Sequence, residues 1–204
     1  YFDPFFITLP KKKKYKTIVT VHDLIPLLFP SHFPSGIKGR FRWYLQKKSL
    51  KKCDAIITDS ISSKKDIIKI INAIPEKIHV VYLSVSDKFR KMEKTKLKEI
   101  KERLNLPEKF ILYVGDVTWN KNLPNLVNAV KQTNFCLVMV GKALLENKFD
   151  KKNEWNKDLL KVFEETKNDK RFVKVGFVSE EDLVGIYNLA TLFATTFSEK
   201  CDTC

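Results

Sequence analysis

The sequence has no run of about 18 consecutive apolar residues, the length that a helix needs to cross a bilayer. We therefore expect no membrane-spanning segment. The first residues, YFDPFFITLPKKKK, carry their positive charges after the apolar part, which is the reverse of a secretory signal peptide. Together these two observations predict a cytoplasmic protein.

Cysteine is scarce, with four residues in a chain of 204. Four are too few for a disulfide scaffold of this size, and Cys136 stands inside an apolar run, where a buried free thiol is usual. Cys201 and Cys204 form one C-x-x-C pair, which without a second pair is weak evidence for zinc or redox chemistry. The three histidines are scattered along the chain: His22, His32 and His79. We therefore expect no metal site.

Arginine is also rare, with five residues among the 38 basic ones, although the net charge is +14. Proteins that read a nucleic-acid sequence usually depend on the forked guanidinium group of arginine. The charge is unevenly placed, because residues 1–92 hold 19 Lys and Arg against 7 Asp and Glu, whereas residues 93–204 hold 19 against 17. The basic first half favours a diffuse anionic partner or a solvated surface over specific recognition of a nucleic acid.

Apolar strands alternate with amphipathic helices in both halves of the chain. The predicted strands are residues 17–22, 54–58, 78–83, 110–114, 135–140, 172–175 and 191–197. This alternation predicts an α/β fold built from parallel sheets. The polar stretch SVSDKFRKMEKTK has no apolar period, so we place a domain junction there. The predicted domains are residues 1–90 and 91–204.

Two serines have the spacing of a capping box, in which the first side chain of the pair caps a helix. They are Ser63, three residues before Asp66, and Ser179, three residues before Asp182. We expect one helix to begin after each serine.

Parallel sheets bind ligands at the carboxyl ends of their strands, so the residues that follow each strand are the candidate site. They are His22, Asp59, Ser60, Gly115, Gly141, Gly176 and Glu199.

The loop GDVTWNKN, which follows strand 110–114, has the layout of a phosphate-binding turn. Gly115 and Lys121 have the spacing of a Walker loop, but Asn120 replaces its second glycine and Asn122 replaces the hydroxyl that would hold magnesium. A dinucleotide fingerprint needs three glycines, and only one is present. Two interpretations stay open. A strand-end glycine, a helix N-terminus and one lysine can hold a diphosphate, or the loop is a plain turn with a surface lysine.

Six segments, read in order, resemble the retaining nucleotide-sugar glycosyltransferases of the GT-B type (glycosyl transferases group 1, family 4-like). They are TVHDLIPLLFP, DAIITDSISSKKDI, IHVVYLSVSDKF, ILYVGDVTWNKNLPNLVNAV, LVMVGK and FVKVGFVSEEDLVGIYNLATLF. The resemblance covers nearly the whole chain. It implies two Rossmann-like domains facing a cleft, with residues 1–90 on the acceptor side and residues 91–204 binding the donor nucleotide. It also implies a fragment, in which both domains are incomplete and which is itself inactive, because the family's first βα units and the second glutamate of its E-x(7)-E motif have no counterpart.

The resemblance assigns donor-side roles to residues of the second domain. Lys121 and the backbone of Gly115 would contact the donor diphosphate. Glu199 matches the first glutamate of the family's motif and would be catalytic. Asp116 stands where many members have an arginine, which removes one of two phosphate-binding cations.

The resemblance also assigns roles in the first domain. His22 would be catalytic, facing the transferred sugar, and Asp23 and Ser60 would lie on the acceptor side. The implied activity is a hexosyltransferase of polysaccharide biosynthesis that moves a sugar from a nucleotide-diphosphate donor to a saccharide or lipid-linked acceptor with retention. It needs no metal ion, and no cofactor apart from the nucleotide-sugar co-substrate.

Residues 38–52 set aromatic and aliphatic side chains beside seven cations. This segment can lie on an anionic membrane on the cytoplasmic side, or it can simply be a solvated basic face. The alternative to a glycosyltransferase is a basic α/β module that binds RNA or another polyanion, with Phe41, Trp43 and Tyr44 available for stacking. No recognised nucleic-acid motif accompanies these residues, so the resemblance is preferred.

Overall fold

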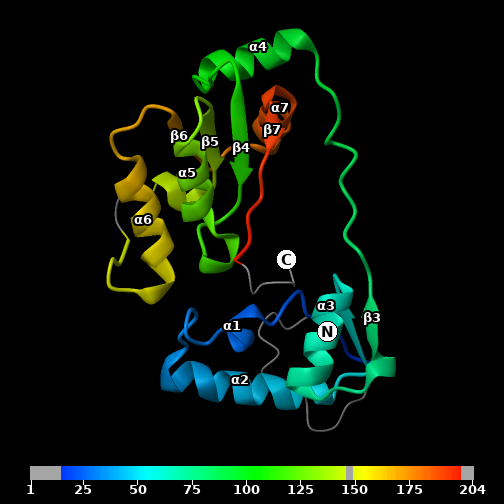
Figure 1. The fold of residues 1–204 in the computed structure, drawn as a ribbon. Coiled ribbons are helices and arrows are strands. Elements are labelled where there is room, and N and C mark those ends of the chain that lie inside the picture. The colour runs from blue at the N-terminus through cyan, green and yellow to red at the C-terminus, as the bar shows by residue number, and fades with distance from the viewer. Residues whose placement is uncertain (1–14, 146–148, 199–204) are drawn as a thin grey trace. The chain divides into compact units, whose positions relative to one another are not determined.

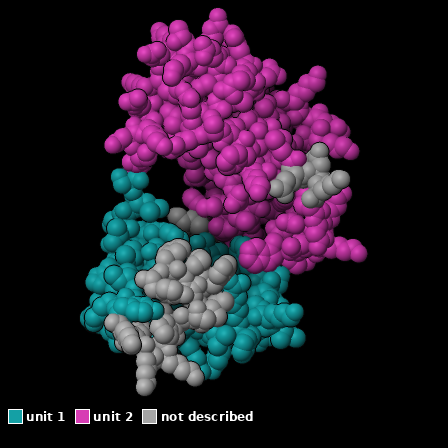
Figure 2. Space-filling model, turned by 180° about the vertical axis from the view of Figure 1, so that it is seen from behind, with its two compact units in different colours: residues 1–84, 201–204 teal, residues 85–200 magenta. Residues whose placement is uncertain are grey.

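The structure is a computed structural model that describes residues 15–145 and 149–198. The described residues form two compact units, one ending at Ser84 and the other beginning at Val85 (Figure 2). Each unit has its own parallel sheet and its own apolar core. The boundary predicted at residues 90 and 91 falls inside the second unit.

The first unit contains a three-stranded sheet in the order β1-β2-β3. Its strands are β1 (Ile18–Thr20), β2 (Ala55–Thr58) and β3 (Ile78–Val80), and both pairings are parallel. The backbone N–H of Val21 donates to Ile57 O and that of Val81 donates to Thr58 O, so the ladder continues one residue beyond β1 and β3. The three strands predicted for this half are confirmed, although each is shorter than its apolar run.

Helices α1 (Ile25–Leu28) and α2 (Gly36–Lys51) connect β1 to β2, and α3 (Ile61–Asp66) follows β2 and continues as the π-helix η1 (Ile67–Ile71) before the short turn η2 (Pro75–Lys77). The wider π turn keeps Ile67 and Ile71 fully buried against Ile56 and Ile78. Asn72 ends the turn in the left-handed conformation, with φ of 56°, which is a usual way to stop a helix. The core of the unit therefore lies between β2, β3 and η1.

One of the two predicted caps is wrong. Helix α3 begins at Ile61, and its cap is Ser60, whose Oγ accepts a hydrogen bond from the backbone N–H of Ser63 at 3.0 Å. Ser63 therefore lies inside the helix. Ser60 stands three residues before Ser63, as Ser63 stands three residues before Asp66, and Ser60 is the first of the two serines after β2. The second prediction is confirmed, since Ser179 Oγ accepts from the N–H of Asp182 at 3.1 Å.

The second unit contains a four-stranded parallel sheet in the order β6-β5-β4-β7 (Figure 1). Its strands are β4 (Phe110–Val114), β5 (Cys136–Val140), β6 (Phe172–Gly176) and β7 (Leu192–Phe193). Strand β7 is much shorter than the predicted 191–197. After Ala194, whose N–H donates to Leu112 O, the chain leaves the sheet, and the hydroxyl of Thr196 donates to Lys121 O in the loop that follows β4.

Helices cover both faces of this sheet. Helices α5 (Leu123–Lys131) and α6 (Lys157–Thr166) pack on one face against Leu137 and Met139 of β5. Helix α7 (Glu180–Leu189) packs on the other face against Val138 and Val140, with α4 (Lys94–Arg103) beside it (Figure 1). Short helical turns complete the unit: η3 (Trp119–Lys121), η4 (Lys142–Leu145) and η5 (Glu154–Asn156). Alternate residues of β5 thus enter two separate core clusters, one on each face of the sheet.

The chain just after the boundary is bound to α7, which explains why it belongs to the second unit. Lys88 Nζ lies 2.6 Å from Glu180 Oε2. Asn188 donates to Arg90 O at 3.0 Å and accepts from the N–H of Met92 at 3.2 Å. All three contacts join residues more than 90 positions apart in the chain.

Helices α4 and α7 are joined by an ion pair between Arg103 and Asp182. Both guanidinium Nη atoms donate to the carboxylate, the Nη1 bond being 3.2 Å long. These hydrogen bonds lower the pKa of Asp182 from its ordinary 3.8, although its partial burial acts in the opposite direction. The close approach of the helices also depends on Gly185, because a Cβ there would lie 2.5 Å from Ile100 Cδ1.

Replacing Asp182 with Asn should lower the free energy of unfolding by about 1 kcal/mol at neutral pH, since a charge-assisted bidentate pair is lost. A carboxyl whose pKa is lower in the folded state stabilises that state above its unfolded pKa. The difference between the two proteins should therefore be constant above about pH 5 and shrink as the pH falls below the unfolded value of 3.8.

Urea denaturation across this pH range measures the effect. The matched control is Glu181→Gln, which removes an exposed pair with Lys96 and should change the free energy by less than about 0.5 kcal/mol. A difference for Asp182→Asn that does not change with pH would contradict the assignment.

Candidate functional site

The first unit brings His22 and Asp59 together at the carboxyl ends of neighbouring strands. His22 follows β1 and Asp59 follows β2, and the ring atom Nδ1 lies 2.6 Å from the carboxylate Oδ2. The His22 side chain is 69% exposed, whereas that of Asp59 is 22% exposed. The sequence placed both residues at strand ends, but it assigned a role only to His22.

Ser60 and Ser63 fix the backbone at the same place. Ser63 Oγ donates to the carbonyl oxygen of His22 at 2.9 Å, which ties the end of β1 to the first turn of α3. Ser60 Oγ accepts from the N–H of Ser63 and donates to Ser63 Oγ at 3.1 Å. Ser60, predicted on the acceptor side, therefore has a structural function as the helix cap, and its contact with an acceptor stays a prediction.

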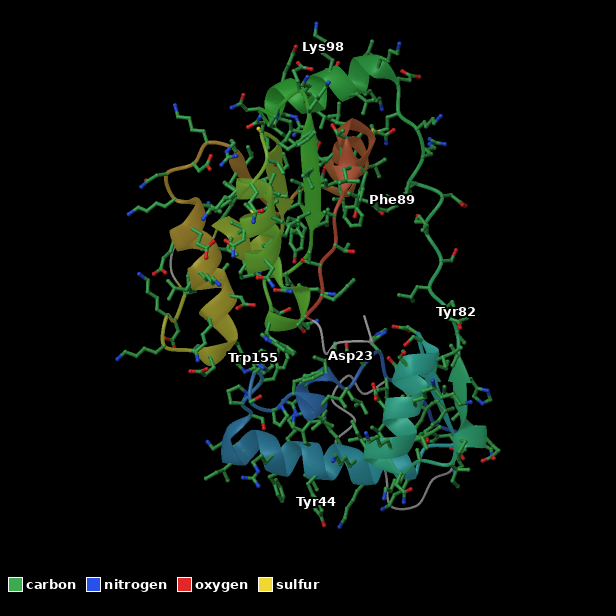
Figure 3. The ribbon with its side chains drawn as sticks, viewed as in Figure 1. Asp23, Tyr44, Tyr82, Phe89, Lys98 and Trp155 are labelled. Carbon is green, nitrogen blue, oxygen red and sulfur yellow. The ribbon has the colours of Figure 1, made fainter. Side chains whose placement is uncertain are left out.

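Asp23, the other predicted acceptor-side residue, uses one carboxylate oxygen locally. Its Oδ1 accepts from the backbone N–H of Ile25 at 3.0 Å, where α1 begins (Figure 3). Asp23 is thus the neighbour of His22 in the sequence, but its carboxylate binds the N–H of Ile25, whereas the ring of His22 binds Asp59.

In the second unit, glycines bring neighbouring strand ends into backbone contact. The N–H of Gly115 donates to Val140 O, and the N–H of Gly141 donates to Gly176 O, each at 3.0 Å. A Cβ added to Gly141 would lie 2.3 Å from Gly115 O, so a side chain has no space there. Gly115 itself has φ of +154°, which side chains rarely adopt. This edge of the sheet thus exposes backbone rather than side chains.

A hydrogen bond from the side chain of Tyr113 fixes the loop after Gly115. The phenol donates to Asp116 O at 2.8 Å, and its burial raises the pKa of Tyr113 well above the ordinary value of 10.0. The Asp116 residue is exposed. Its negative charge therefore lies at the surface of the loop, at the position where many members of the resembled family have an arginine.

Helix α5 contributes less to an anion site than we expected. Asn122, just before the helix, is left-handed with φ of 51°, and its side chain makes no capping bond. Pro124 has no N–H, and the N–H of Asn125 already donates to Asn122 O. A helix normally offers four free N–H groups at its start, so this one offers fewer. Most of the positive charge of the loop therefore comes from Lys121.

The segment that precedes Glu199 lies against this lysine. Thr196 Oγ1 donates to Lys121 O at 2.7 Å, and Asn122 Nδ2 donates to Phe197 O at 3.1 Å. The Lys121 ammonium lies 5.6 Å from the centre of the Phe197 ring, within the range of a cation–π contact. Glu199 lies outside the described residues. Sequence reasoning missed Thr196, and no local signal could have found it, because its partner is 75 residues away.

A groove of about 550 Å³ in the second unit lies apart from these strand ends. It runs between the segment after the boundary and α7, and Lys88, Lys96, Glu180 and Glu181 line it. Two of its exposed ion pairs, Lys88–Glu180 and Lys96–Glu181, join its walls. It contains none of the predicted site residues.

Within residues 15–145 and 149–198, no three His, Cys, Asp or Glu side chains lie together as metal ligands would. No helix in the same ranges has both the length and the apolar content needed to cross a bilayer.

Comparison with known proteins decides the family. Residues 1–89 match Glycosyltransferase Family 4, and residues 93–199, more than half of the chain, match Glycosyl transferases group 1. The chain belongs to the glycosyl transferases group 1 family. Its βα order and the resemblance stated from its six segments are thereby confirmed.

The most similar relatives that we compared with this group 1 chain carry the name of mannosyltransferases. Serotype-specific mannosyltransferase WbdA of Escherichia coli is 23% identical over 202 residues, which cover 94% of this chain and 24% of WbdA. O-antigen chain mannosyltransferase RfbU of Salmonella typhimurium is 34% identical over 115 residues, which cover 55% of this chain and 28% of RfbU. The group 1 chain thus spans about a quarter of the length of these curated relatives.

Solved structures show the same fold. HepE of Anabaena, crystallised with UDP-glucose, matches with a TM-score of 0.65 at 18% identity, over 89% of this chain and 47% of HepE. Sucrose-phosphate synthase of Thermosynechococcus elongatus matches with a TM-score of 0.67 at 19% identity, over 90% of this chain and 45% of that chain. The predicted GT-B-type α/β fold with two Rossmann-like parallel sheets is confirmed for this group 1 chain.

Replacing Tyr113 with Phe should lower the free energy of unfolding of the group 1 chain by about 1 kcal/mol, because Asp116 O loses a partly buried hydrogen bond. The amide signals of the loop after Gly115 should shift in a two-dimensional NMR spectrum. Tyr44→Phe is the control, since that phenol is exposed, and it should change stability by less than about 0.5 kcal/mol. Equal stability of Tyr113→Phe and the parent chain would show that the bond does not hold the loop.

Proposed function

We propose that the protein to which this chain belongs is a hexosyltransferase, which moves a sugar from a nucleotide-diphosphate donor to a saccharide or lipid-linked acceptor with retention of configuration. Membership of the group 1 family and the names of the matched relatives support the proposal. Because the relatives are mannosyltransferases, a mannosyl donor is the first to test. The observation that carries the proposal is the loop at the end of β4, where Thr196 and Phe197 contact Lys121.

The chemical requirement of such a transfer is to stabilise the negative charge that develops on the leaving diphosphate. A fixed ammonium group near that charge does so, and so do backbone N–H groups that need no reorganisation. Lys121 supplies the ammonium, and its backbone is fixed by Thr196. Gly141 packs directly against Gly115 O, and we propose that a phosphate approaches the partly exposed backbone of Gly115, which carries no Cβ. We propose that these groups act without a metal ion or a further cofactor.

Asp116 opposes this role, because its exposed carboxylate lies five positions before Lys121 in the same loop. A like charge near a diphosphate weakens binding by an amount that falls with added salt. The loop after β4 therefore carries one cation, Lys121, and one anion, Asp116, and donor affinity depends on the balance between them.

The acceptor is proposed to be reached at an anionic membrane surface on the cytoplasmic side, through α2. The outward stripe of this helix is apolar and aromatic, with Ile37 87%, Phe41 63% and Tyr44 51% exposed. Figure 3 shows Tyr44 pointing away from the strands of its unit. Its buried residues are Leu50, which enters the core, and polar Gln46 and Ser49. An apolar and aromatic stripe on the exposed side suits a helix that lies on lipid headgroups.

The first test is thermal stabilisation of the chain by GDP-, UDP- and ADP-sugars, compared with ATP–Mg and with oligonucleotides. We expect a nucleotide sugar to raise the melting temperature, with no change when a chelator is added. Lys121→Met should weaken donor binding about tenfold or more, because a charge-assisted hydrogen bond contributes about 1.5–3 kcal/mol. Asp116→Asn should strengthen it.

The control is Lys109→Met, which removes an exposed lysine at the amino end of the same strand and should leave donor affinity unchanged. Stabilisation by oligonucleotides alone would replace the transferase proposal with the polyanion-binding module. Loss of donor binding on chelation would contradict the metal-independent part only.

The second test is sedimentation with vesicles. The chain should bind vesicles that contain anionic lipid, and binding should weaken as salt is added. Lys48→Gln and Lys51→Gln should each lower the partition coefficient about fivefold, since a basic residue near such a surface contributes about 1 kcal/mol. Lys65→Gln, on the exposed side of α3, is the control and should bind as the parent chain does. Binding that is insensitive to salt, or no binding, would refute this contact.

A further inference from the structure

The imidazole of His22 is held at one of its two nitrogens. Nδ1 lies 2.6 Å from Asp59 Oδ2, and the rest of the side chain is open, with 69% of it exposed. An ionised carboxylate can only accept a hydrogen bond, so the Nδ1 atom of His22 must donate. When the ring is neutral it carries one proton, and with that proton on Nδ1 the second nitrogen, Nε2, has a free lone pair.

The same turn fixes the backbone that carries this ring. Ser63 Oγ donates to His22 O at 2.9 Å, and Ser63 is itself held by Ser60, whose Oγ accepts the Ser63 N–H at 3.0 Å. The turn from Asp59 to Ser63 therefore holds both the main chain and the side chain of a residue about 40 positions earlier. The ring cannot rotate freely without breaking the bond to Asp59.

The choice of carboxylate is specific. Asp23 is the covalent neighbour of His22, yet its Oδ1 accepts from the N–H of Ile25 at 3.0 Å. Asp59 is 37 residues away and reaches the ring because β1 and β2 pair in parallel. The partner of His22 is thus set by the sheet and not by the adjacent sequence.

We propose that Asp59 is a positioning residue, which keeps Nε2 of His22 unprotonated so that this atom accepts a hydrogen bond from a hydroxyl group of a bound sugar. A sugar hydroxyl has a proton to donate, whereas an ionised phosphate or carboxylate has none and would require a protonated Nε2. In the neutral ring, Nε2 can therefore accept from a hydroxyl group but cannot donate to an ionised phosphate or carboxylate. The identity of the ligand rests on the proposed function, whereas the position of the ring proton does not.

The test is nitrogen-15 NMR of the ring atoms in the labelled chain at a pH where the rings are neutral. Only three histidines are present, so His32 and His79 serve as internal references. We expect the His22 Nδ1 signal at the protonated position and Nε2 at the unprotonated one. Asp59→Ala should move the proton to Nε2, the form that free imidazole side chains favour, while Asp59→Asn, which keeps an acceptor oxygen, should retain part of the Nδ1–H signal.

Asp23→Ala is the matched control, because it removes the adjacent carboxylate without removing the partner of the ring, and it should leave the His22 signals in place. The amide spectrum of each variant shows whether the fold is kept. A protonated Nε2 in the parent chain, or an Asp59→Ala spectrum identical to that of the parent, would overturn the positioning role of Asp59.

The ligand is tested by adding a nucleotide sugar or a methyl hexoside to the parent chain. A shift of the Nε2 signal with the nucleotide sugar indicates the donor sugar, and a shift with the hexoside alone indicates the acceptor. A nucleotide sugar that raises the melting temperature while neither compound moves Nε2 would overturn the ligand assignment. If no nucleotide sugar binds, the proposed function fails, and the ring signals still decide the role of Asp59.

Discussion

Parallel strand pairing is the constraint on which the candidate site depends. Because β1 pairs in parallel with β2, the residues that follow the two strands emerge at one edge, and His22 comes within 2.6 Å of Asp59. The same constraint in the second unit places Gly115 against Gly141. A slip of one residue in either pairing would turn every following side chain to the other face of its sheet. The register therefore determines the chemistry at both edges.

The two sheets present different kinds of surface at these edges. The first unit uses side chains, with Asp59 and Ser63 holding His22. The second unit uses backbone, since Gly115 and Gly141 follow β4 and β5, β6 ends at Gly176, and a side chain at Gly141 would collide with Gly115 O. A ligand of the first edge meets oriented side-chain groups, whereas a ligand of the second can approach the main chain. Under the proposed function, the first edge would meet a sugar hydroxyl and the second a phosphate.

Local sequence patterns predicted what local forces determine. The apolar run 110–114 forms β4 with the predicted bounds, and Ser179 caps α7, because a strand core and a helix cap depend on neighbouring residues. Patterns failed at the cap of α3, where Ser60 takes the place predicted for Ser63, and they failed where distant contacts decide. Strand β7 ends early because Thr196 bonds to the Lys121 loop, and no local signal reveals that partner. The His22–Asp59 bond also needed the strand order, although both residues were recognised as strand ends.

The burial of individual side chains of helix α2 bears on whether this helix contacts a membrane or is a solvated basic face. Leu50 enters the core, but Ile37 and Phe41 are exposed while polar Gln46 and Ser49 are buried. A helix of a soluble domain gains stability by burying its apolar side, so the exposed Ile37 and Phe41 leave apolar area in contact with water at a free-energy cost. Contact with a lipid surface would remove that area from water, and nearby lysines such as Lys48 would add attraction to anionic headgroups. The same exposed stripe on a wholly solvated basic helix would have no such compensation, which is why the membrane interpretation of this helix is preferred to the solvated one.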